Sequence, residues 1–371
     1  MAAERELTSS EQDWLRVRHY LREHRYELAE SAAHEFPAER LVAGTSLLAG
    51  PTWVPAAPLP LHGIELELHS GTGETELPDI ADLAALPLRS DGRRYSRYSE
   101  AIGELAAPAI FENRSTYRLL DVDLSGPKGR LVFGRGTYFD GIDTGEASAH
   151  EYAANRIGGE VGGLRAAISE PCDPNRRPIN LAISTLTLRH DRGAGTATFL
   201  MHWRDPAKVG HAGGLYQVIP VGVFQASGEA PWNERNDFSL WRSMVREFAE
   251  ELLGKPEDYD SEREPIDYGS WPFARRMVEE MQSGGIRAFC LGAGVDPLTY
   301  AADLLTVVVF DAPTFDELFG EVVSVNAEGQ ILAAKPLDGP TVDHLVRDEP
   351  VQAAGAALLA LAWQHRDVVL G

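Results

Sequence analysis

The stretch RSMVREFAEELLGK, residues 242–255, combines an apolar helical pattern with a group of acidic side chains. Its bulky apolar residues recur at helical spacing and are Met244, Val245, Phe248, Leu252 and Leu253. Glu247, Glu250 and Glu251 are separated by helical spacing too, so they share one helix face. Three neighbouring carboxylates repel one another unless a cation lies between them, and such oxygen ligands suit Mg²⁺ or Mn²⁺. The stretch therefore predicts either a solvated acidic face or a divalent metal site.

Length and charge limit the classes of function. The chain has 371 residues, 44% of them hydrophobic, which is enough for a sizeable core and for two domains. Its formal net charge is −22 at pH 7, and its few lysines are scattered, so no basic patch is present. A surface of this sign repels phosphate backbones and anionic lipid head groups. We therefore expect neither direct nucleic-acid binding nor membrane association.

The cysteines and apolar runs predict a cytoplasmic location. Cys172 and Cys290 are the two cysteines, and no CxxC pair is present, so we expect ordinary reduced thiols. No N-terminal segment joins a basic start to an apolar stretch, and the longest apolar runs, LLTVVVF and AAGAALLALAW, are too short to span a bilayer. These features favour a cytosolic protein without a targeting or membrane segment.

The first predicted element is an amphipathic helix over residues 9–36. Ser9 or Ser10 can cap it, with Gln12 or Asp13 completing a capping box. Its apolar residues recur at roughly helical spacing, as expected for a helix that packs on a core.

The rest of the N-terminal half is predicted to be an α+β domain, residues 1–175, whose role the sequence does not indicate. The proline-rich stretch GPTWVPAAPLPLHG favours an extended connector, and three alternating segments predict strands: GIELEL, YRLLDVDL and RLVFGRGTYFD. Residues 147–168 are predicted to be helical. The Pro/Asp/Asn/Arg cluster SEPCDPNRRP then indicates a domain boundary.

Residues 176–350 are predicted to form a second unit of mixed strands and helices. Strands are expected at LAISTLTLRH, ATFLMHWRD, GLYQVIPVGVFQ, IRAFCLGAGVD and DLLTVVVFD, and a second helix at PFARRMVEEMQ. Residues 351–371 contain an apolar helix, VQAAGAALLALAWQH, that we expect to dock on the core.

The run REFAEE, from Arg246 to Glu251, resembles the core of the Nudix box, G-x5-E-x7-R-E-U-x-E-E-x-G-U, where U is a bulky apolar residue. Gly228 and Glu234 keep the first spacing of that pattern. Between Glu234 and Arg246 the chain has eleven residues instead of seven, and Gly254 comes one residue late. The box is therefore recognisable but irregular.

The surrounding strands extend the resemblance to about residues 180–345. Gly214, Tyr216, Pro220 and Gly222 match the segment that leads into the box in Nudix domains, and LLTVVVF matches the long strand that follows the box helix. The resemblance implies an α/β fold with a C-terminal Nudix-like α/β/α sandwich, preceded by the α+β N-terminal domain.

The resemblance also implies roles for the box residues. Glu247, Glu250 and Glu251 would hold Mg²⁺ or Mn²⁺ against a diphosphate, and the metal would lower the pKa of a bound water. Arg246 would orient Glu247 as a catalytic group, and Glu234 would contribute a salt bridge. A general base can also come from a later loop, where the weak candidates are Glu317 and Glu321.

Contacts to a substrate are expected from the strands before the box. Arg204 and Lys208 lie in a predicted loop and can contact phosphate, although solvated loop charges are an equally good interpretation. Four aromatic residues can stack on a base, but aromatics on strands more often belong to a core; they are Trp203, Tyr216, Phe224 and Trp232. The glycine-rich segment GRGTY at 134–138 lacks the spacing of a phosphate-binding loop.

Two functions follow from the resemblance. The first is Mg²⁺-dependent hydrolysis of a nucleoside diphosphate linked to another group. The second is a Nudix-like domain that binds a nucleotide-like small molecule without turnover and serves as the sensing part of a transcriptional regulatory system. The intact box carboxylates favour the enzyme, and the four-residue insertion and the shifted glycine favour the sensor. A homodimer is compatible with both functions.

Overall fold

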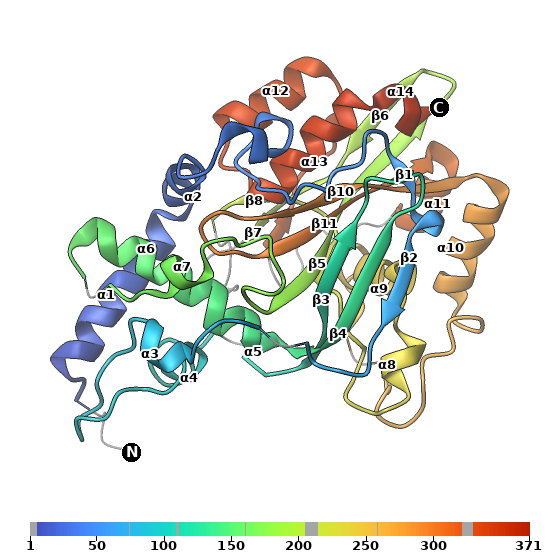
Figure 1. Cartoon of the computed structure of the whole chain (residues 1–371). Coiled ribbons are helices and arrows are strands. Elements are labelled where there is room, and N and C mark those ends of the chain that lie inside the picture. Colours follow the sequence, from blue (N-terminus) through green and yellow to red (C-terminus); the bar gives the residue numbers. More distant parts are fainter. Residues whose placement is uncertain are drawn as a thin grey trace.

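The structure is a computed structural model that describes residues 6–73, 75–108, 111–159, 161–204, 214–257, 259–320 and 329–371. It is a mixed α/β protein, which confirms the predicted α/β class. Helices surround a long twisted sheet, and the N-terminal helices lie at one side of it (Figure 1). Among the described helices, none is both long and apolar enough to cross a membrane.

The central sheet contains parallel and antiparallel neighbours. Its main path is β1 (Leu59–Pro60), β10 (Ile286–Val295), β11 (Ala302–Asp311), β5 (Ile179–Asp191), β3 (Ser115–Asp123), β4 (Arg130–Thr137) and β2 (Glu65–Leu68). Three shorter strands join off this path, namely β6 (Thr196–Phe199), β9 (Val221–Val223) and β13 (Lys335–Pro336). A small second sheet has the order β12 (Gly329–Ile331), β7 (Met201–Arg204) and β8 (Tyr216–Val218).

β5 and β11 form the centre of the sheet and run parallel, from the pair Ala302↔Leu181 to the pair Asp311↔His190. In β11 every residue except Asp311 is buried. Its run LLTVVVF, apolar except for Thr306, is the pattern expected of a strand covered on both faces. The strand predicted at DLLTVVVFD is therefore present as β11, and it is almost completely buried.

The sheet continues across the boundary that the sequence predicts after residue 175. β3 precedes that boundary and β5 follows it, yet the two strands pair antiparallel at Arg118↔Asn180 and Leu119↔Ile179. One hydrophobic core contains buried residues from both halves of the chain. The predicted division between residues 1–175 and 176–350 thus does not coincide with an edge of the sheet.

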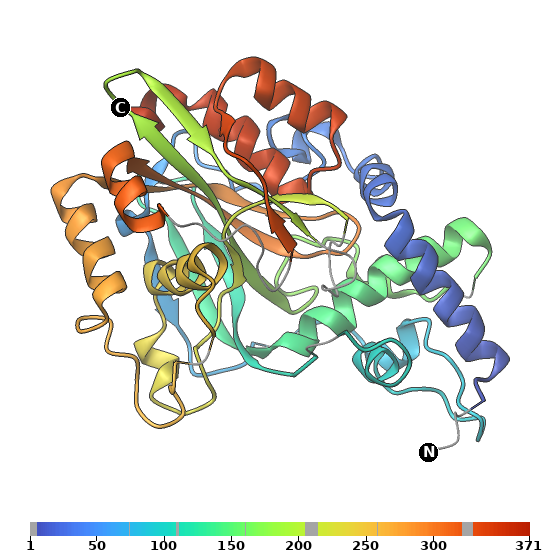
Figure 2. The same cartoon turned by 180° about the vertical axis from the view of Figure 1, so that it is seen from behind.

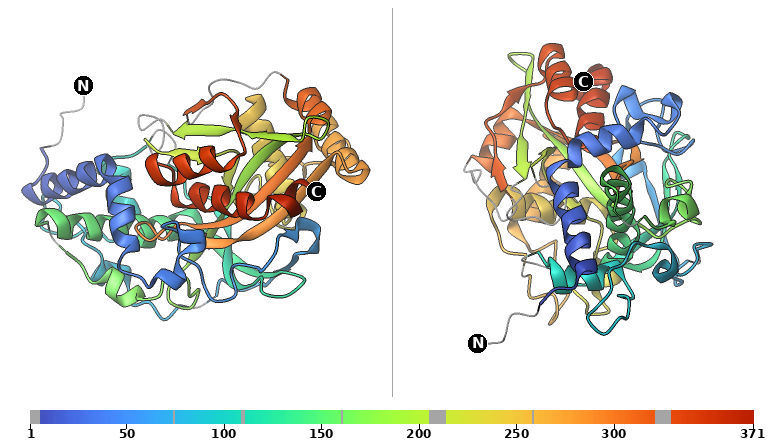
Figure 3. Two further views of the ribbon diagram at one scale, coloured as in Figure 1. Left: turned by 90° about the horizontal axis from the view of Figure 1, so that it is seen from above. Right: turned by 90° about the vertical axis from the view of Figure 1, so that its left-hand side faces the viewer.

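Helices cover the sheet on more than one side. α13 (Ala353–Gln364), from the apolar tail, is buried along most of its length and contacts β5, β10 and β11. α9 (Leu240–Glu247) lies behind the strands in Figure 1 and in front of them in Figure 2. The other C-terminal helices are α10 (Pro272–Ser283), α11 (Ala312–Phe319), α12 (Gly339–Asp348) and α14 (Arg366–Leu370). Figure 3 shows α12–α14 from above, grouped beside the strands.

The N-terminal helices form a layer with its own small core. The predicted helix over 9–36 is divided into α1 (Ser9–Glu23) and α2 (Arg25–Ala33). Thr8 caps α1 and Glu11 completes the capping box, one or two positions earlier than the sequence analysis places them. The other short helices of this half are α3 (Ile80–Leu83), α4 (Tyr98–Leu105), α5 (Tyr138–Gly141), α6 (Ala147–Ile157), α7 (Leu164–Ile168) and the 3-10 turns Ala38–Arg40, Val42–Gly44 and Leu61–Gly63.

A buried polar network joins α1 and α2 to α6. A π-helical turn, Ile142–Glu146, leads into α6 and carries Glu146 at its end. The Glu146 carboxylate pairs with Arg18 at 2.7 Å and with Arg25 at 3.0 Å. One turn further along, His150 is buried, and its Nδ1 lies 3.1 Å from the Tyr98 hydroxyl.

His150 makes the stability of this layer pH-dependent. Burial lowers the pKa of His150 to about 3, and the positive charge of Arg18 acts in the same direction. The unfolded chain therefore binds a proton below about pH 6.5 that the folded chain does not, and stability is lost as the pH falls through that value. Between pH 7 and pH 5 we expect this group to lower the free energy of unfolding by about 2 kcal/mol.

Urea unfolding of the wild type and of His150→Gln at the two pH values tests this expectation. Gln keeps a polar group near Tyr98 but does not titrate, so the variant should lose less stability on acidification than the wild type. Other titrating groups act equally in both proteins and cancel in the difference. Equal losses would show that His150 is not the cause.

Candidate functional site

The box helix departs from regular α-helical geometry inside the acidic segment. α9 is continued by a π-helical turn, Phe248–Leu252. The ring of Phe248 is buried against Phe310 of β11, with ring centroids 5.5 Å apart. Gly254, at φ +62°, has the left-handed conformation common just after a helix. This glycine is the one that comes late in the Nudix pattern, and a wide π turn accommodates an additional helical residue.

Two of the box carboxylates lie against the β8–β9 segment. The backbone N–H of Val221 donates to Glu251 Oε1 at 2.6 Å, and Glu251 Oε2 lies 4.0 Å from His202 Nδ1. Glu247 lies over Gly222, where an added Cβ would be 1.9 Å from a carboxylate oxygen. Glycine is therefore required at 222 for Glu247 to keep this position, which gives a local reason for that element of the Nudix-like pattern.

The third box carboxylate, Glu250, has a different neighbour. The Tyr259 hydroxyl donates to its Oε1 at 2.6 Å. Burial raises the pKa of Glu250 to about 7, although the hydrogen bond from Tyr259 acts in the opposite direction. Glu250 is thus a half-buried acid that gains or loses a proton near neutral pH, and groups with shifted pKa values of this kind are candidates for functional sites.

The three carboxylates do not form the metal group that their spacing predicts. Glu251 accepts from a backbone N–H, Glu250 accepts from a tyrosine, and Glu247 lies against Gly222. In the part of the chain that the structure describes, no three His, Cys, Asp or Glu side chains are grouped so as to hold a metal ion. The π turn is wider than an α-helical turn, so it alters the shared face on which the prediction of a Mg²⁺ or Mn²⁺ site depends. As placed, these residues do not fit a bound divalent ion.

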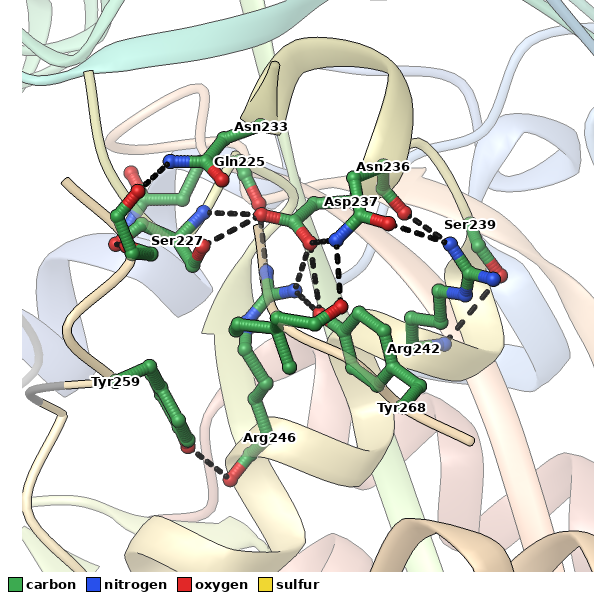
Figure 4. Close-up of polar contacts among 12 residues, drawn as sticks. Gln225, Ser227, Asn233, Asn236, Asp237, Ser239, Arg242, Arg246, Tyr259 and Tyr268 are labelled. Atoms are coloured by element: carbon green, nitrogen blue, oxygen red, sulfur yellow. Dashed lines mark hydrogen bonds and ion pairs between the residues drawn. The ribbon is translucent and has the colours of Figure 1, made fainter. Parts of the chain in front are cut away.

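Arg246 belongs to a buried polar cluster beside the box helix (Figure 4). Its Nη1 donates to the Tyr268 hydroxyl at 2.6 Å, and its Nη2 donates to the carbonyl of Gln225 at 2.7 Å. Asp237 is completely buried, and its Oδ1 lies 3.6 Å from Arg246 Nη1. No hydrogen bond between described residues supports the predicted role of Arg246 in orienting Glu247.

Asp237 connects this cluster to the loop before the helix. The backbone N–H and the hydroxyl of Ser227 donate to its Oδ2 at 2.8 and 2.6 Å, and Tyr268 donates to its Oδ1 at 2.8 Å. Arg246, Asp237 and Tyr268 therefore hold residues 225–237 and the segment around 268 against the box helix. This cluster determines the position of the loop that contains the four-residue insertion.

Among the described residues, Glu234 contacts the central sheet and not the box carboxylates. It lies on α8 (Asn233–Asn236) and pairs with Arg135 of β4, the contact between Nη2 and Oε2 being 2.9 Å. The Tyr117 hydroxyl donates to the carbonyl of Glu234 at 2.7 Å. The predicted salt bridge from Glu234 is present, but it joins α8 to the sheet and does not reach Arg246.

The predicted substrate contacts have mixed outcomes. Arg204 ends β7 and Tyr216 begins β8, so the strands place both residues beside the same loop. Lys208 lies outside the described residues. Phe224 is completely buried, with its ring centroid 4.6 Å from that of Tyr117, so the prediction that it stacks on a substrate is wrong.

The later-loop candidates for a general base are not brought to the box. Glu317 pairs with Arg276 at 2.9 Å on the surface between α11 and α10. Glu321 lies outside the described residues. Three residues of the site were missed from the sequence, namely Tyr259, Tyr268 and Asp237. Each makes its contacts through the tertiary fold, so no local spacing marks it.

Comparison with known proteins leaves the family open. No protein-family model matches this sequence, and no curated protein matches it significantly.

Proposed function

We propose that this chain is a sensor with a Nudix-like domain, which binds a nucleotide-like small molecule beside the box helix and does not hydrolyse it. The ligand class comes from the Nudix resemblance of residues 228–254. The observation that favours binding over hydrolysis is the use of the box carboxylates as acceptors within the protein: Tyr259 donates to Glu250, and the Val221 N–H donates to Glu251.

The geometry of the helix supports a binding role at this position. π-helical turns occur frequently at functional sites, and the turn Phe248–Leu252 carries both Glu250 and Glu251. Glu250 is half-buried and its pKa is raised to about 7, so a ligand can exchange a hydrogen bond with it at little electrostatic penalty. We place the protein in the cytoplasm, within a transcriptional regulatory system.

Hydrolysis remains the competing prediction, because all three box carboxylates are present. It requires Glu247, Glu250 and Glu251 to leave their present neighbours and converge on one ion. Screening a panel of nucleoside diphosphates linked to sugars and other groups, with Mg²⁺ and with Mn²⁺, distinguishes hydrolysis from binding. The unfolding midpoint reports binding by mass action, and ³¹P NMR reports the release of phosphate or nucleoside monophosphate.

We expect at least one compound to raise the unfolding midpoint without forming product. In Glu250→Gln, the affinity for that compound should fall by about tenfold, as expected for the loss of one charge-assisted hydrogen bond. Glu264→Gln, which removes an exposed carboxylate from the following loop, is the matched control and should bind like the wild type. Metal-dependent product release that falls by about two orders of magnitude or more in Glu250→Gln would establish the hydrolase instead.

A further inference from the structure

Four arginines of the described residues are almost completely buried, and their partners differ. Arg25, Arg118, Arg177 and Arg246 have exposed fractions of 7%, 7%, 2% and 4%. Arg25 pairs with Glu146 and Arg246 pairs with Asp237.

Arg177 has no carboxylate, but its Nε and Nη1 donate to the carbonyls of Pro171 and Pro178, and its guanidinium lies over the ring of Tyr300. Arg177 Nη2 is buried without a hydrogen-bond partner. Arg118 differs from the other three in having two such nitrogens.

Arg118 lies on β3 with most of its hydrogen-bonding groups unused. Its Nη1 donates to the carbonyl of Gly73 at 3.2 Å, whereas its buried Nε and Nη2 have no hydrogen-bond partner. None of the ion pairs among the described residues includes it, and the charge of Asp140 acts on it without a hydrogen bond between described residues. Burial lowers the pKa of this guanidinium, and Asp140 only partly offsets that effect. A buried cation that is not paired with a described carboxylate is unfavourable, and an anionic ligand would stabilise it.

The two unused nitrogens also have a specific geometry. Nε–H and one N–H of Nη2 point in parallel along one edge of the guanidinium plane. That edge matches the paired oxygens of a carboxylate or phosphate, which bind it through two parallel hydrogen bonds. The two unused donors of Arg118 therefore match a single oxyanion in geometry.

Two glycines lie close to Arg118, Gly136 on β4 and Gly73. A Cβ at Gly136 would be 2.9 Å from the Arg118 Cβ, and a Cβ at Gly73 would be 3.9 Å from its Cζ. Gly73 also has φ +67°, a conformation that favours glycine. Glycine at 136, in the GRGTY segment, thus allows the backbone of β4 to approach Arg118 closely, whereas an added Cβ at Gly73 would clash with Leu120 at 2.5 Å.

This location is separate from the box helix. Neighbouring residues of a strand point to opposite faces of the sheet. Tyr117 packs on Phe224 and Phe238, which follow β9 and precede α9 on the box side. Arg118, the next residue, therefore points to the other face.

We propose that Arg118 is the anchor of a second ligand site, in which Nε and Nη2 bind one oxyanion, a carboxylate or a phosphate, on the face of β3 opposite the box helix. Both nitrogens are enclosed by protein, so the groups that cover them have to shift for the anion to bind. The site is independent of the proposed box ligand and does not require the sensor function to be correct.

The test is the dependence of the unfolding midpoint on inorganic phosphate and, in a separate series, on acetate, each at fixed ionic strength. Phosphate stabilises most proteins by exclusion from their surface, so the readout is the difference between variants and not the rise itself. Arg118→Met keeps the length of the side chain and removes the guanidinium. Arg177→Met does the same at the other buried arginine that lacks a carboxylate and serves as the matched control.

We expect one of the two anions to stabilise the wild type and Arg177→Met by the same increment, and Arg118→Met by clearly less. The active anion then identifies phosphate or carboxylate as the ligand class. If Arg118→Met does not fold, Arg118→Lys keeps the charge without the two-pronged edge, and calorimetry should show about tenfold weaker binding. The proposal is wrong if the wild type and the Arg118 variant respond identically to both anions, or if Arg118→Lys binds as tightly as the wild type.

Discussion

Asp237→Ala is expected to lower the free energy of unfolding by about 3–5 kcal/mol, because it leaves the buried charge of Arg246 without its counter-ion. Asp237 is completely buried and also accepts hydrogen bonds from the backbone and hydroxyl of Ser227 and from Tyr268. The substitution therefore leaves the donors of Ser227 and Tyr268 without their acceptor, and Arg246 without its carboxylate, in the protein interior. Urea unfolding at neutral pH measures the loss directly.

Two further variants show whether the charge or the packing is responsible. Asp237→Asn keeps the size and one acceptor oxygen, and should lose less stability than Asp237→Ala. The double variant Asp237→Leu with Arg246→Met removes both charges, and should recover much of the stability, because apolar replacements of a buried ion pair are often tolerated. A loss in Asp237→Ala below about 1 kcal/mol would mean that the cluster is hydrated and that Arg246 does not depend on Asp237.

Much of the fold was predictable where the pattern is local. The run LLTVVVF, residues 304–310, is apolar except for Thr306 and indicates a strand covered on both faces, and β11 is one. The apolar tail predicted a docked helix, and α13 packs on the central strands. The predicted helix over 147–168 is interrupted because Gly158, at φ +70°, ends α6. That glycine was visible in the sequence, whereas the break at His24 between α1 and α2 has no glycine or proline to mark it.

The domain boundary shows what local patterns do not contain. The cluster SEPCDPNRRP, predicted to be a domain boundary, lies in irregular chain before β5. Whether β3 then pairs with β5 depends on contacts between residues far apart in sequence, such as Leu119 and Ile179. A composition that ends one element says nothing about which strand the next element joins. One sheet therefore runs through a position that looks like a linker.

The candidate site was predictable in its residues but not in their partners. Helical spacing placed Glu247, Glu250 and Glu251 together, and the structure keeps them within one helical segment. Their neighbours come from other parts of the chain: Tyr259 follows the helix, and Val221 precedes it by a strand and a loop. A periodicity argument assumes a regular α-helix, and the π turn violates that assumption where the acidic residues lie.

Glu146→Ala is expected to lower the free energy of unfolding by a similar amount, about 3–5 kcal/mol, because two arginines depend on one carboxylate. Glu146 Oε2 is 2.7 Å from Arg18 Nη1, and Arg25 donates to both carboxylate oxygens at 3.0 and 3.1 Å. Without Glu146, the guanidinium groups of Arg18 and Arg25 lose the carboxylate that both contact. Repulsion then adds to the loss of hydrogen bonds.

Because the Arg18–Arg25–Glu146 network is buried, the salt dependence of the stability loss distinguishes it from an effect of exposed charges. Salt screens exposed charges, whereas it acts much less on buried pairs, so the loss should be nearly the same in dilute buffer and at about 1 M NaCl. The triple variant Arg18→Met, Arg25→Met and Glu146→Met should be more stable than Glu146→Ala, since it removes the stranded cations together with the acid. If the triple variant is as unstable as Glu146→Ala, shape and not charge holds α1 and α2 on α6. The π turn Ile142–Glu146 would then owe its position to packing, and the paired arginines would be dispensable for the layer.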